Sequence, residues 1–338
     1  MKEIPLQSII KSLTLKRLTN AAKAVSAFVI SSTSKKPVTW GKPFILTVEP
    51  TNLCNLRCPL CVTGNGSMQR TTGFMDFRTF KQIIDDAEET LIYLLLYQQG
   101  EPFLHKEFLQ FVTYAKSKQI CVVTSSNGHY FSEEVANKTV ASGLDSLIVS
   151  IDGIDQKSYE TYRVGGNLDQ VIQGVRNLVA EKKRQKSKTP HIQLQFLVMH
   201  HNEHQIKAMR ELAGELGVDN FLIKSVQVET LSEAAVWLPQ KESFKRYKND
   251  SGELRLKHTG KGSCPRPWTS SLVNWDGSIA PCCFDKQGHF TLGKINSKNH
   301  LNGIWETTDY VQFRETILRN RQSIDICANC TQGIRFYF

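Results

Sequence analysis

"TNLCNLRCPLCVTG", at residues 51–64, places three cysteines within eight positions, at Cys54, Cys58 and Cys61. The stretch directly follows a short apolar run, "FILTV" at 44–48, which predicts a buried strand. Zinc favours four tetrahedral ligands, commonly as paired Cys-x2-Cys units. A [4Fe–4S] cube held by only three thiolates keeps one iron free to bind something else. The spacing therefore favours an iron–sulfur cluster with an open site, with zinc as the alternative.

Downstream of this loop, short apolar runs alternate with helical patterns as far as residue 226. The predicted strands are 44–48, 91–97, 120–125, 146–152, 192–199 and 221–226. The predicted helices are 76–90, 106–119, 132–142, 167–186 and 203–216. Regular strand–helix alternation is typical of a parallel sheet that closes fully or partly into a barrel. We therefore expect an α/β fold with a partial (β/α)6 TIM-like barrel.

Polar motifs follow the first four predicted strands at the point where each strand ends. The cysteine loop follows the first strand, "QGEP" (99–102) the second, "SSNG" (125–128) the third and "SIDG" (150–153) the fourth. In barrels of this kind the chemistry lies at the carboxyl ends of the strands. The four motifs are thus expected to form one site.

A second group of cysteines lies near the end of the chain. Cys264 is followed after seventeen residues by Cys282, and after forty-four more by Cys327 and Cys330. Four thiolates suit a closed [4Fe–4S] cluster, and a four-cysteine zinc site is the alternative. Asp285 and Arg266 lie close to these cysteines in the sequence, but neither is assigned as a general base, and the catalytic residue stays unassigned.

The cysteine loop and the strand-end motifs together resemble the radical S-adenosylmethionine (radical SAM) superfamily, with Gln99 in place of the usual first glycine of a GGEP motif. In that family the open iron binds the amino and carboxylate groups of S-adenosylmethionine (SAM). The resemblance implies that Glu101 holds the amino group and that Ser150 and Arg163 hold the carboxylate. The full set of SAM-binding residues that it implies is Gly100, Glu101, Pro102, Ser126, Asn127, Ser150, Asp152, Arg163 and Val198. Of these, Ser126 and Asn127 match the ribose-contacting turn, and Val198 lies in the strand beside adenine.

The tail, with "NWDGSIAPCC" (274–283), resembles the SPASM extension of radical SAM enzymes in its short form with one auxiliary [4Fe–4S] cluster. The ligands implied are Cys264, Cys282, Cys327 and Cys330, where the Gly277-x4-Cys pattern favours Cys282 and leaves Cys283 as the alternative. The predicted domains are a basic segment 1–43, a radical SAM core 44–226, a linker 227–262 and an auxiliary-cluster domain 263–338.

The net charge of +10 is concentrated in residues 1–43, which hold eight Lys and Arg against one Glu. The remaining chain lacks the strongly basic surface of a nucleic-acid binder. Apolar residues recur at helical spacing over residues 1–30, so this segment either packs on the main domain or contacts an anionic membrane surface. No secretory signal is evident and the cysteines fit a reducing compartment, so we expect a cytoplasmic location.

The resemblance implies an enzyme that reductively cleaves SAM to a 5′-deoxyadenosyl radical, which abstracts hydrogen from a substrate C–H bond. Its partner would be a low-potential electron donor of the flavodoxin or ferredoxin type. We expect the substrate to be a small molecule or precursor, and a peptide- or protein-modifying maturase is the alternative. A competing hypothesis from another class is a non-catalytic iron–sulfur electron carrier or a zinc-stabilised binding protein.

Overall fold

The computed structural model describes residues 6–250, 252–257, 262–328 and 330. Its main feature is a nine-stranded curved sheet in the order β11-β10-β9-β1-β2-β3-β4-β5-β6. Neighbouring strands from β9 through β1 to β6 run parallel, whereas β10 is antiparallel to both of its neighbours, β9 and β11. The strands are β1 Ile45–Val48, β2 Tyr93–Leu95, β3 Cys121–Ser126, β4 Ser146–Ser150, β5 His191–Val198, β6 Asn220–Ser225, β9 Ser270–Val273, β10 Ser278–Ala280 and β11 Gly293–Lys294.

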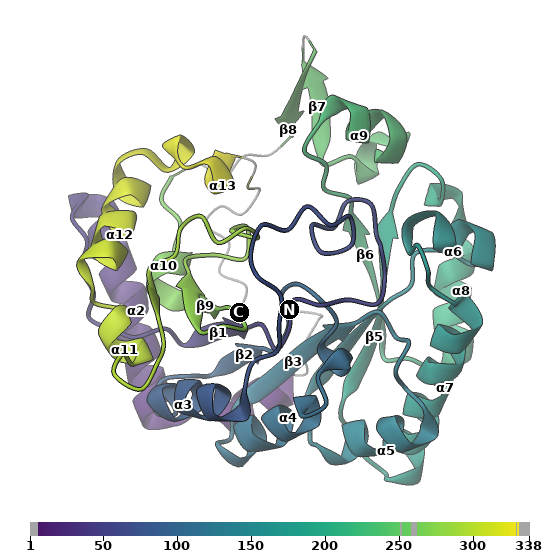
Figure 1. Ribbon diagram of the computed structural model, residues 1–338, viewed down its shortest axis with the longest axis horizontal. Coiled ribbons are helices and arrows are strands. Elements are labelled where there is room, and N and C mark those ends of the chain that lie inside the picture. Colours follow the sequence, from purple (N-terminus) through teal and green to yellow (C-terminus); the bar gives the residue numbers. More distant parts are fainter. Residues whose placement is uncertain (1–5, 251, 258–261, 329, 331–338) are drawn as a thin grey trace.

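Helices cover the outer face of this sheet, so that the strands curve around an inner space (Figure 1). They are α3 Phe77–Ala87, α4 Phe108–Ser117, α5 Glu133–Ala141, α6 Gln156–Tyr162, α7 Leu168–Arg184 and α8 Ile206–Leu216. The partial (β/α)6 barrel expected from the sequence is confirmed. The short helix α6 was not predicted.

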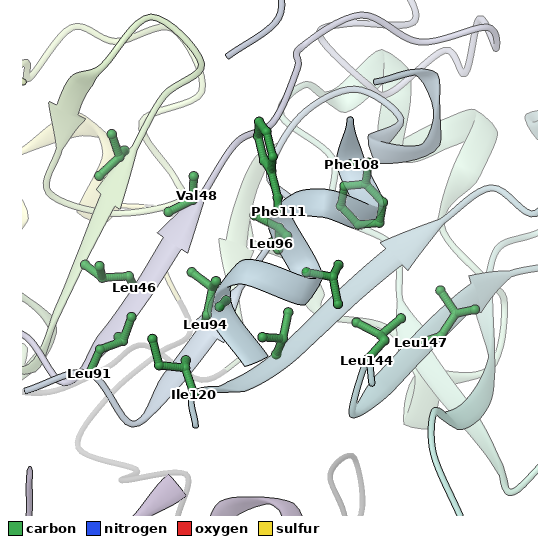
Figure 2. Packing of buried hydrophobic residues seen from close by; sticks show 14 of the residues in the cluster. Leu46, Val48, Leu91, Leu94, Leu96, Phe108, Phe111, Ile120, Leu144 and Leu147 are labelled. Atoms are coloured by element: carbon green, nitrogen blue, oxygen red, sulfur yellow. The ribbon is translucent and has the colours of Figure 1, made fainter. Parts of the chain in front are cut away.

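The core lies between the strands and the outer helices. Figure 2 shows Leu46 of β1 and Leu94 of β2 among the buried side chains that pack with the aromatic residues of α4. Phe80 of α3 stacks on Phe111 of α4 with ring centroids 4.3 Å apart. The helices bury the apolar residues of the strands, such as Leu147, Ile148 and Val149 of β4, and these short apolar runs made the strands visible in the sequence.

The C-terminal part of the chain extends the barrel sheet. Strand β9 lies parallel to β1, with Ile45 opposite Ser270 and Val48 opposite Val273. Four helices complete this part of the chain: α10 Arg266–Thr269, α11 Leu301–Ile304, α12 Thr308–Asn320 and α13 Asp325–Ala328. The two cysteine-bearing regions therefore share one continuous sheet.

The N-terminal segment forms two helices, α1 Leu6–Ser12 and α2 Leu15–Ser34, which lie behind the sheet in Figure 1. The break comes at Thr14, whose side chain caps the start of α2 by accepting a hydrogen bond from the Arg17 amide. The Arg17 guanidinium is buried and donates to the carbonyls of Glu88, Lys118 and Gln119, just before β2 and β3. One face of the segment therefore packs on the amino-terminal end of the barrel.

Residues 227–262, expected as a plain linker, contain regular structure. Helix α9 spans Leu231–Trp237 and begins with a capping box between Thr230 and Glu233. Strands β7 Tyr247–Asp250 and β8 Glu253–Leu256 pair as an antiparallel hairpin. Across the described ranges of the chain, every helix is too short or too polar to cross a bilayer.

Candidate functional site

A cavity of about 260 Å³ lies at the carboxyl ends of the first four strands. Nine of the residues predicted for the site line it: Cys54, Cys58, Cys61, Gly100, Glu101, Ser126, Asn127, Ser150 and Arg163. These residues come from the loops after β1, β2 and β3, the end of β4 and the end of α6. The strand-end motifs therefore do meet in one place, as a parallel barrel requires.

The cysteine loop is held against the neighbouring motifs by backbone contacts. The Arg57 amide donates to the carbonyl of Val164 at 3.0 Å, and the Glu101 amide donates to the carbonyl of Leu53 at 2.8 Å. Gly100 has φ +74, and a Cβ there would lie 2.6 Å from the carbonyl oxygens of Thr51 and Leu53. Only glycine allows this approach, so Gly100 places the second motif directly beside the first.

Glu101 is the buried acid of the cavity, with 2% of its surface exposed. Its carboxylate accepts hydrogen bonds from the Asn127 amide at 2.7 Å, the Ser126 hydroxyl at 2.9 Å and the Phe103 amide at 3.1 Å. Burial raises the pKa of Glu101 to about 7, against the opposing effect of these donors. The group can therefore change charge near neutral pH.

Arg163 is the cation of the cavity. Its Nε donates to the Asp152 carboxylate at 2.6 Å, and a terminal nitrogen lies 4.0 Å from Cys58 Sγ. The other oxygen of Asp152 accepts from the Leu197 amide at 2.7 Å. Burial acts to lower the pKa of Arg163, but Asp152 together with Cys58, Tyr162 and Tyr159 outweighs this effect, and the pKa is raised. The guanidinium therefore stays charged, with one edge fixed and the other turned to the thiols.

Three predicted residues support the cavity rather than line it. Asp152 and Val198 are fully buried, Asp152 behind Arg163 and Val198 at the end of β5, and Pro102 is buried in the first turn after Glu101. Residues that the sequence reasoning missed also line the cavity: Leu56, Gly64, Tyr97, Gln98, Ser125 and Tyr162. Each lies within a few positions of a predicted motif residue, and that adjacency was the available signal.

The second group of cysteines gathers around two arginines. Burial acts to lower the pKa of Arg266, but the neighbouring Cys283, Cys282, Cys264 and Cys330 raise it. Burial likewise acts to lower the pKa of Arg321, and Cys264, Cys330 and Cys327 raise it. Arg266 and Arg321 thus place positive charge beside the four predicted auxiliary ligands.

Cys283 and Asp285 have local partners in this second group. Arg266 lies 3.6 Å from Cys283 Sγ, and the Cys282 thiol together with this arginine lowers the pKa of Cys283. The Asp285 carboxylate accepts from the amides of His289 and Phe290 at 2.9 and 3.0 Å. Asp285 therefore holds its own loop, which explains its burial.

Side chains between the two groups tie them together. The buried Glu49 carboxylate, directly after β1, accepts two hydrogen bonds from Arg70, each 2.8 Å long. Arg70 Nε also donates to the carbonyl of Lys286, and the side-chain Nε2 of Gln98 donates to the carbonyl of Cys283 at 2.8 Å. A buried bidentate pair of this kind fixes geometry as well as charge.

The first three cysteines have the chemistry of a cluster site. Burial raises the pKa of Cys54 to about 11 and also raises the pKa of Cys58, so a thiolate here needs a compensating cation. Among the described residues, no three His, Cys, Asp or Glu side chains converge as they would around a single metal ion. Cys54, Cys58 and Cys61 instead line the wall of a cavity, beside polar side chains that leave room for a further ligand. The residues present fit an iron–sulfur cluster with a ligand bound next to it.

Comparison with known proteins agrees with this chemistry. Residues 48–213 match the family model of the radical SAM superfamily. The chain belongs to this superfamily. Residues 264–331 match the SPASM model, described as an iron-sulfur cluster-binding domain. The chain is therefore a radical SAM enzyme, with [4Fe–4S] clusters and SAM as its cofactors, and the zinc-stabilised and electron-carrier hypotheses are not favoured.

Among curated relatives, mycofactocin maturase MftC of Mycobacterium tuberculosis is 25% identical over 311 residues, covering 85% of this chain and 75% of MftC. The tungsten-containing aldehyde ferredoxin oxidoreductase cofactor-modifying protein of Pyrococcus furiosus is 22% identical over 314 residues, covering 85% and 86%. Among solved structures, Streptococcus suis SuiB bound to S-adenosylmethionine superposes with a TM-score of 0.64 at 14% identity, covering 91% of this chain and 76% of SuiB. The structural likeness confirms the expected fold.

Proposed function

We propose that this radical SAM enzyme is a maturase that modifies a peptide or protein substrate at a C–H position. The observation that carries the proposal is the cavity in which three cysteines, one buried carboxylate and one partly buried guanidinium face the same space. The match to MftC over most of both chains supports the class of reaction. SuiB, which shares the fold, has been solved bound to the precursor peptide SuiA.

The cavity residues have distinct roles in this proposal. Cys54, Cys58 and Cys61 hold the [4Fe–4S] cluster, which when bound supplies the electron that cleaves SAM to a 5′-deoxyadenosyl radical. Glu101 accepts hydrogen bonds from the ammonium group of SAM, and the Arg163 edge turned towards Cys58 receives its carboxylate. Burial of the Glu101 carboxylate keeps water away from this end of the cavity.

Two further groups of residues complete the assignment. Ser126, Asn127 and Ser150 offer polar atoms at the rim of the same cavity, where they orient the sugar and the carboxylate of SAM. Gly100, Pro102, Asp152 and Val198 shape and support this wall. Cys264, Cys282, Cys327 and Cys330 hold one auxiliary cluster, within the proposed domain 263–338. Its four thiolates leave no open iron, which suits electron transfer rather than SAM binding.

The remaining partners follow from this chemistry. Reduction of the first cluster requires a low-potential donor, and flavodoxin- or ferredoxin-type proteins supply electrons in this range. Nine cysteines, seven of them proposed as cluster ligands, fit a reducing, cytoplasmic compartment. The expectation of a small-molecule substrate becomes the second candidate, since the Pyrococcus relative is named for modifying a cofactor.

Anaerobic assays with the iron-loaded chain test the proposal. Dithionite-reduced protein should release 5′-deoxyadenosine from SAM, and mass spectrometry should show a mass loss of a candidate peptide encoded beside its gene. Release of 5′-deoxyadenosine with no change in any neighbouring peptide would support the small-molecule substrate. Failure to cleave SAM with a full complement of iron would contradict the assignment of the cavity.

Glu101 should make SAM binding depend on pH. Only the carboxylate attracts an ammonium group, and the raised pKa of about 7 means that protonation begins near neutral pH. Affinity for SAM should therefore fall as pH drops from 8 to 6, approaching about tenfold per pH unit well below the pKa. Anaerobic calorimetric titration of the iron-loaded protein measures the effect. Glu101→Gln should bind weakly at every pH, whereas Glu134→Gln on the surface of α5 should behave like the wild type.

Glu101 should also make the stability of the folded protein depend on pH, and here low pH should be favourable, whereas low pH weakens SAM binding. Because burial raises the folded pKa of Glu101 above its ordinary value of 4.5, the protonated form favours folding. This contribution is complete below the ordinary value and is lost as pH rises through about 7. Two results together would refute the predicted titration. They are a wild-type affinity for SAM that does not change with pH, and a Glu101→Gln variant whose stability depends on pH as that of the wild type does. They would show that Glu101 stays ionised.

A further inference from the structure

The first two helices carry most of the exposed apolar side chains of the protein. Within the described part of the chain, ten large hydrophobic residues are exposed, and seven of them fall between residues 6 and 40. Six of these lie on α1 and α2 and are called the basal patch here: Leu6, Ile10, Leu15, Leu18, Val29 and Ile30. Exposure reaches 82% at Leu15 and 63% at Leu6. Such a concentration of apolar surface indicates a contact site.

The basal patch lies on a different face of α2 from the one that packs against the rest of the protein. On α2 the buried residues are Arg17, Ala24, Ala27, Phe28 and Ser31. Leu15, Leu18 and Val29 lie roughly opposite these residues on the helix, given 3.6 residues per turn. Phe28 packs on Trp268 with ring centroids 5.5 Å apart, so the fold already covers the other face. Helix α2 is thus apolar on two sides, one facing the barrel and one facing solvent.

Positive charge surrounds the patch. Residues 6–43 contain no Asp or Glu. Five exposed lysines lie on or directly after the two helices: Lys11, Lys16, Lys23, Lys35 and Lys36. Lys16 pairs with Glu89 of the neighbouring barrel surface at the edge of the patch. An apolar stripe flanked by lysines is the pattern of a helix that lies in the interface of an anionic membrane.

We propose that the basal patch docks this enzyme on an anionic phospholipid bilayer. The charge pattern favours a membrane over a second copy of the chain. A two-fold dimer through this patch would bring the same surface against itself and oppose lysines to lysines. A bilayer carrying anionic headgroups attracts these lysines and accepts the leucines between them.

The docked orientation keeps the active-site cavity open to water. Helices α1 and α2 pack at the amino-terminal end of the barrel, where Ile9 and Leu13 pack against a small cluster that contains Phe44 and Ile92, the residues directly before β1 and β2. The cavity lies at the carboxyl ends of the same strands. In Figure 1 the dark blue loop after β1 crosses the front of the barrel, whereas the purple helices lie behind it. A substrate therefore reaches the cavity from the aqueous side while the protein stays on the membrane.

Vesicle flotation of the full chain tests the proposal. The wild type should float with phosphatidylcholine vesicles containing phosphatidylglycerol at low ionic strength, and much less with phosphatidylcholine alone. Leu15→Ser/Leu18→Ser should lower the partition coefficient at least tenfold, since two leucine side chains no longer enter the apolar layer. Lys11→Glu/Lys23→Glu should weaken binding to the anionic vesicles specifically. All variants should keep their circular dichroism spectrum, because the replaced side chains are exposed.

The matched control uses apolar residues that are exposed elsewhere. Leu231→Ser/Val236→Ser changes two such side chains on α9 and should leave flotation unchanged. Flotation by Leu15→Ser/Leu18→Ser equal to that of the wild type would overturn the proposal. A second pattern of results would also overturn it. In this pattern neither protein floats, and multi-angle light scattering shows a wild-type dimer that is a monomer in the Leu15→Ser/Leu18→Ser variant.

Discussion

Replacing Cys58 with alanine should abolish SAM cleavage and remove about half of the bound iron. Cys58 is the most buried of the three loop cysteines and lies 4.0 Å from Arg163. Loss of groups that merely support metal ligands already costs about 10–100-fold, so loss of a ligand should cost more. Release of 5′-deoxyadenosine from SAM, measured anaerobically against iron content, should fall by more than about 100-fold.

Cys121 supplies the matched control for this change. It is fully buried in β3, and burial raises its pKa far above the ordinary value, so its thiol is a small apolar group in the core. Cys121→Ala should keep the iron content and the SAM-cleaving activity of the wild type. Equal losses in Cys58→Ala and Cys121→Ala would mean that the effect comes from misfolding, and the ligand assignment would lose its support.

The strands and their end motifs could be predicted because their signals are local. Strands such as Ser146–Ser150 are buried on both faces and read as short apolar runs. Parallel strands place their carboxyl ends on one edge, so the meeting of Glu101, Asn127 and Ser150 could be expected from the order of the motifs, whereas Arg163 was implied only by the family resemblance. The sequence thus predicted the barrel and most of the cavity wall from separate, short signals.

The features that escaped prediction depend on contacts between distant residues. Strand β9 is four residues long and pairs with β1 from the other end of the chain, and no local pattern encodes such a pairing. The positions of Arg266 and Arg321 beside the second group of cysteines depend on that pairing as well. Helix α9 differs, since the capping box at Thr230 and Glu233 was present in the sequence as an unused signal.

The shared sheet has a mechanistic consequence. Because β9 adjoins β1, Cys264 and Cys282, which lie before β9 and after β10, are close in sequence to strands of the sheet that also carries the cysteine loop. The Glu49–Arg70 pair fixes the segment that follows the cysteine loop, and the hydrogen bond from Gln98 to Cys283 joins the loop after β2 to the second group of cysteines. If both cysteine groups hold the proposed clusters, these contacts would fix the distance between the clusters, which electron transfer between them would require.

Replacing Cys327 with alanine should separate SAM binding from substrate turnover. Cys327 belongs to the second group and does not line the SAM cavity. The variant should bind SAM as the wild type does, since changes at distant sites act independently to within about 0.5 kcal/mol. Formation of modified product should fall by more than about 100-fold, as expected for loss of a cluster ligand. Calorimetric titration with SAM and mass spectrometry of the substrate measure the two effects.

Cys283→Ala is the informative control because its thiol adjoins a proposed ligand and contacts Arg266 instead. If Cys282 is the ligand, Cys283→Ala should keep the full iron content, and Cys282→Ala should lose as much iron as Cys327→Ala. The reverse pattern would assign the ligand role to Cys283. If Cys327→Ala loses SAM binding together with turnover, the two groups of cysteines do not act as separate centres, and the proposed division of labour between them is wrong.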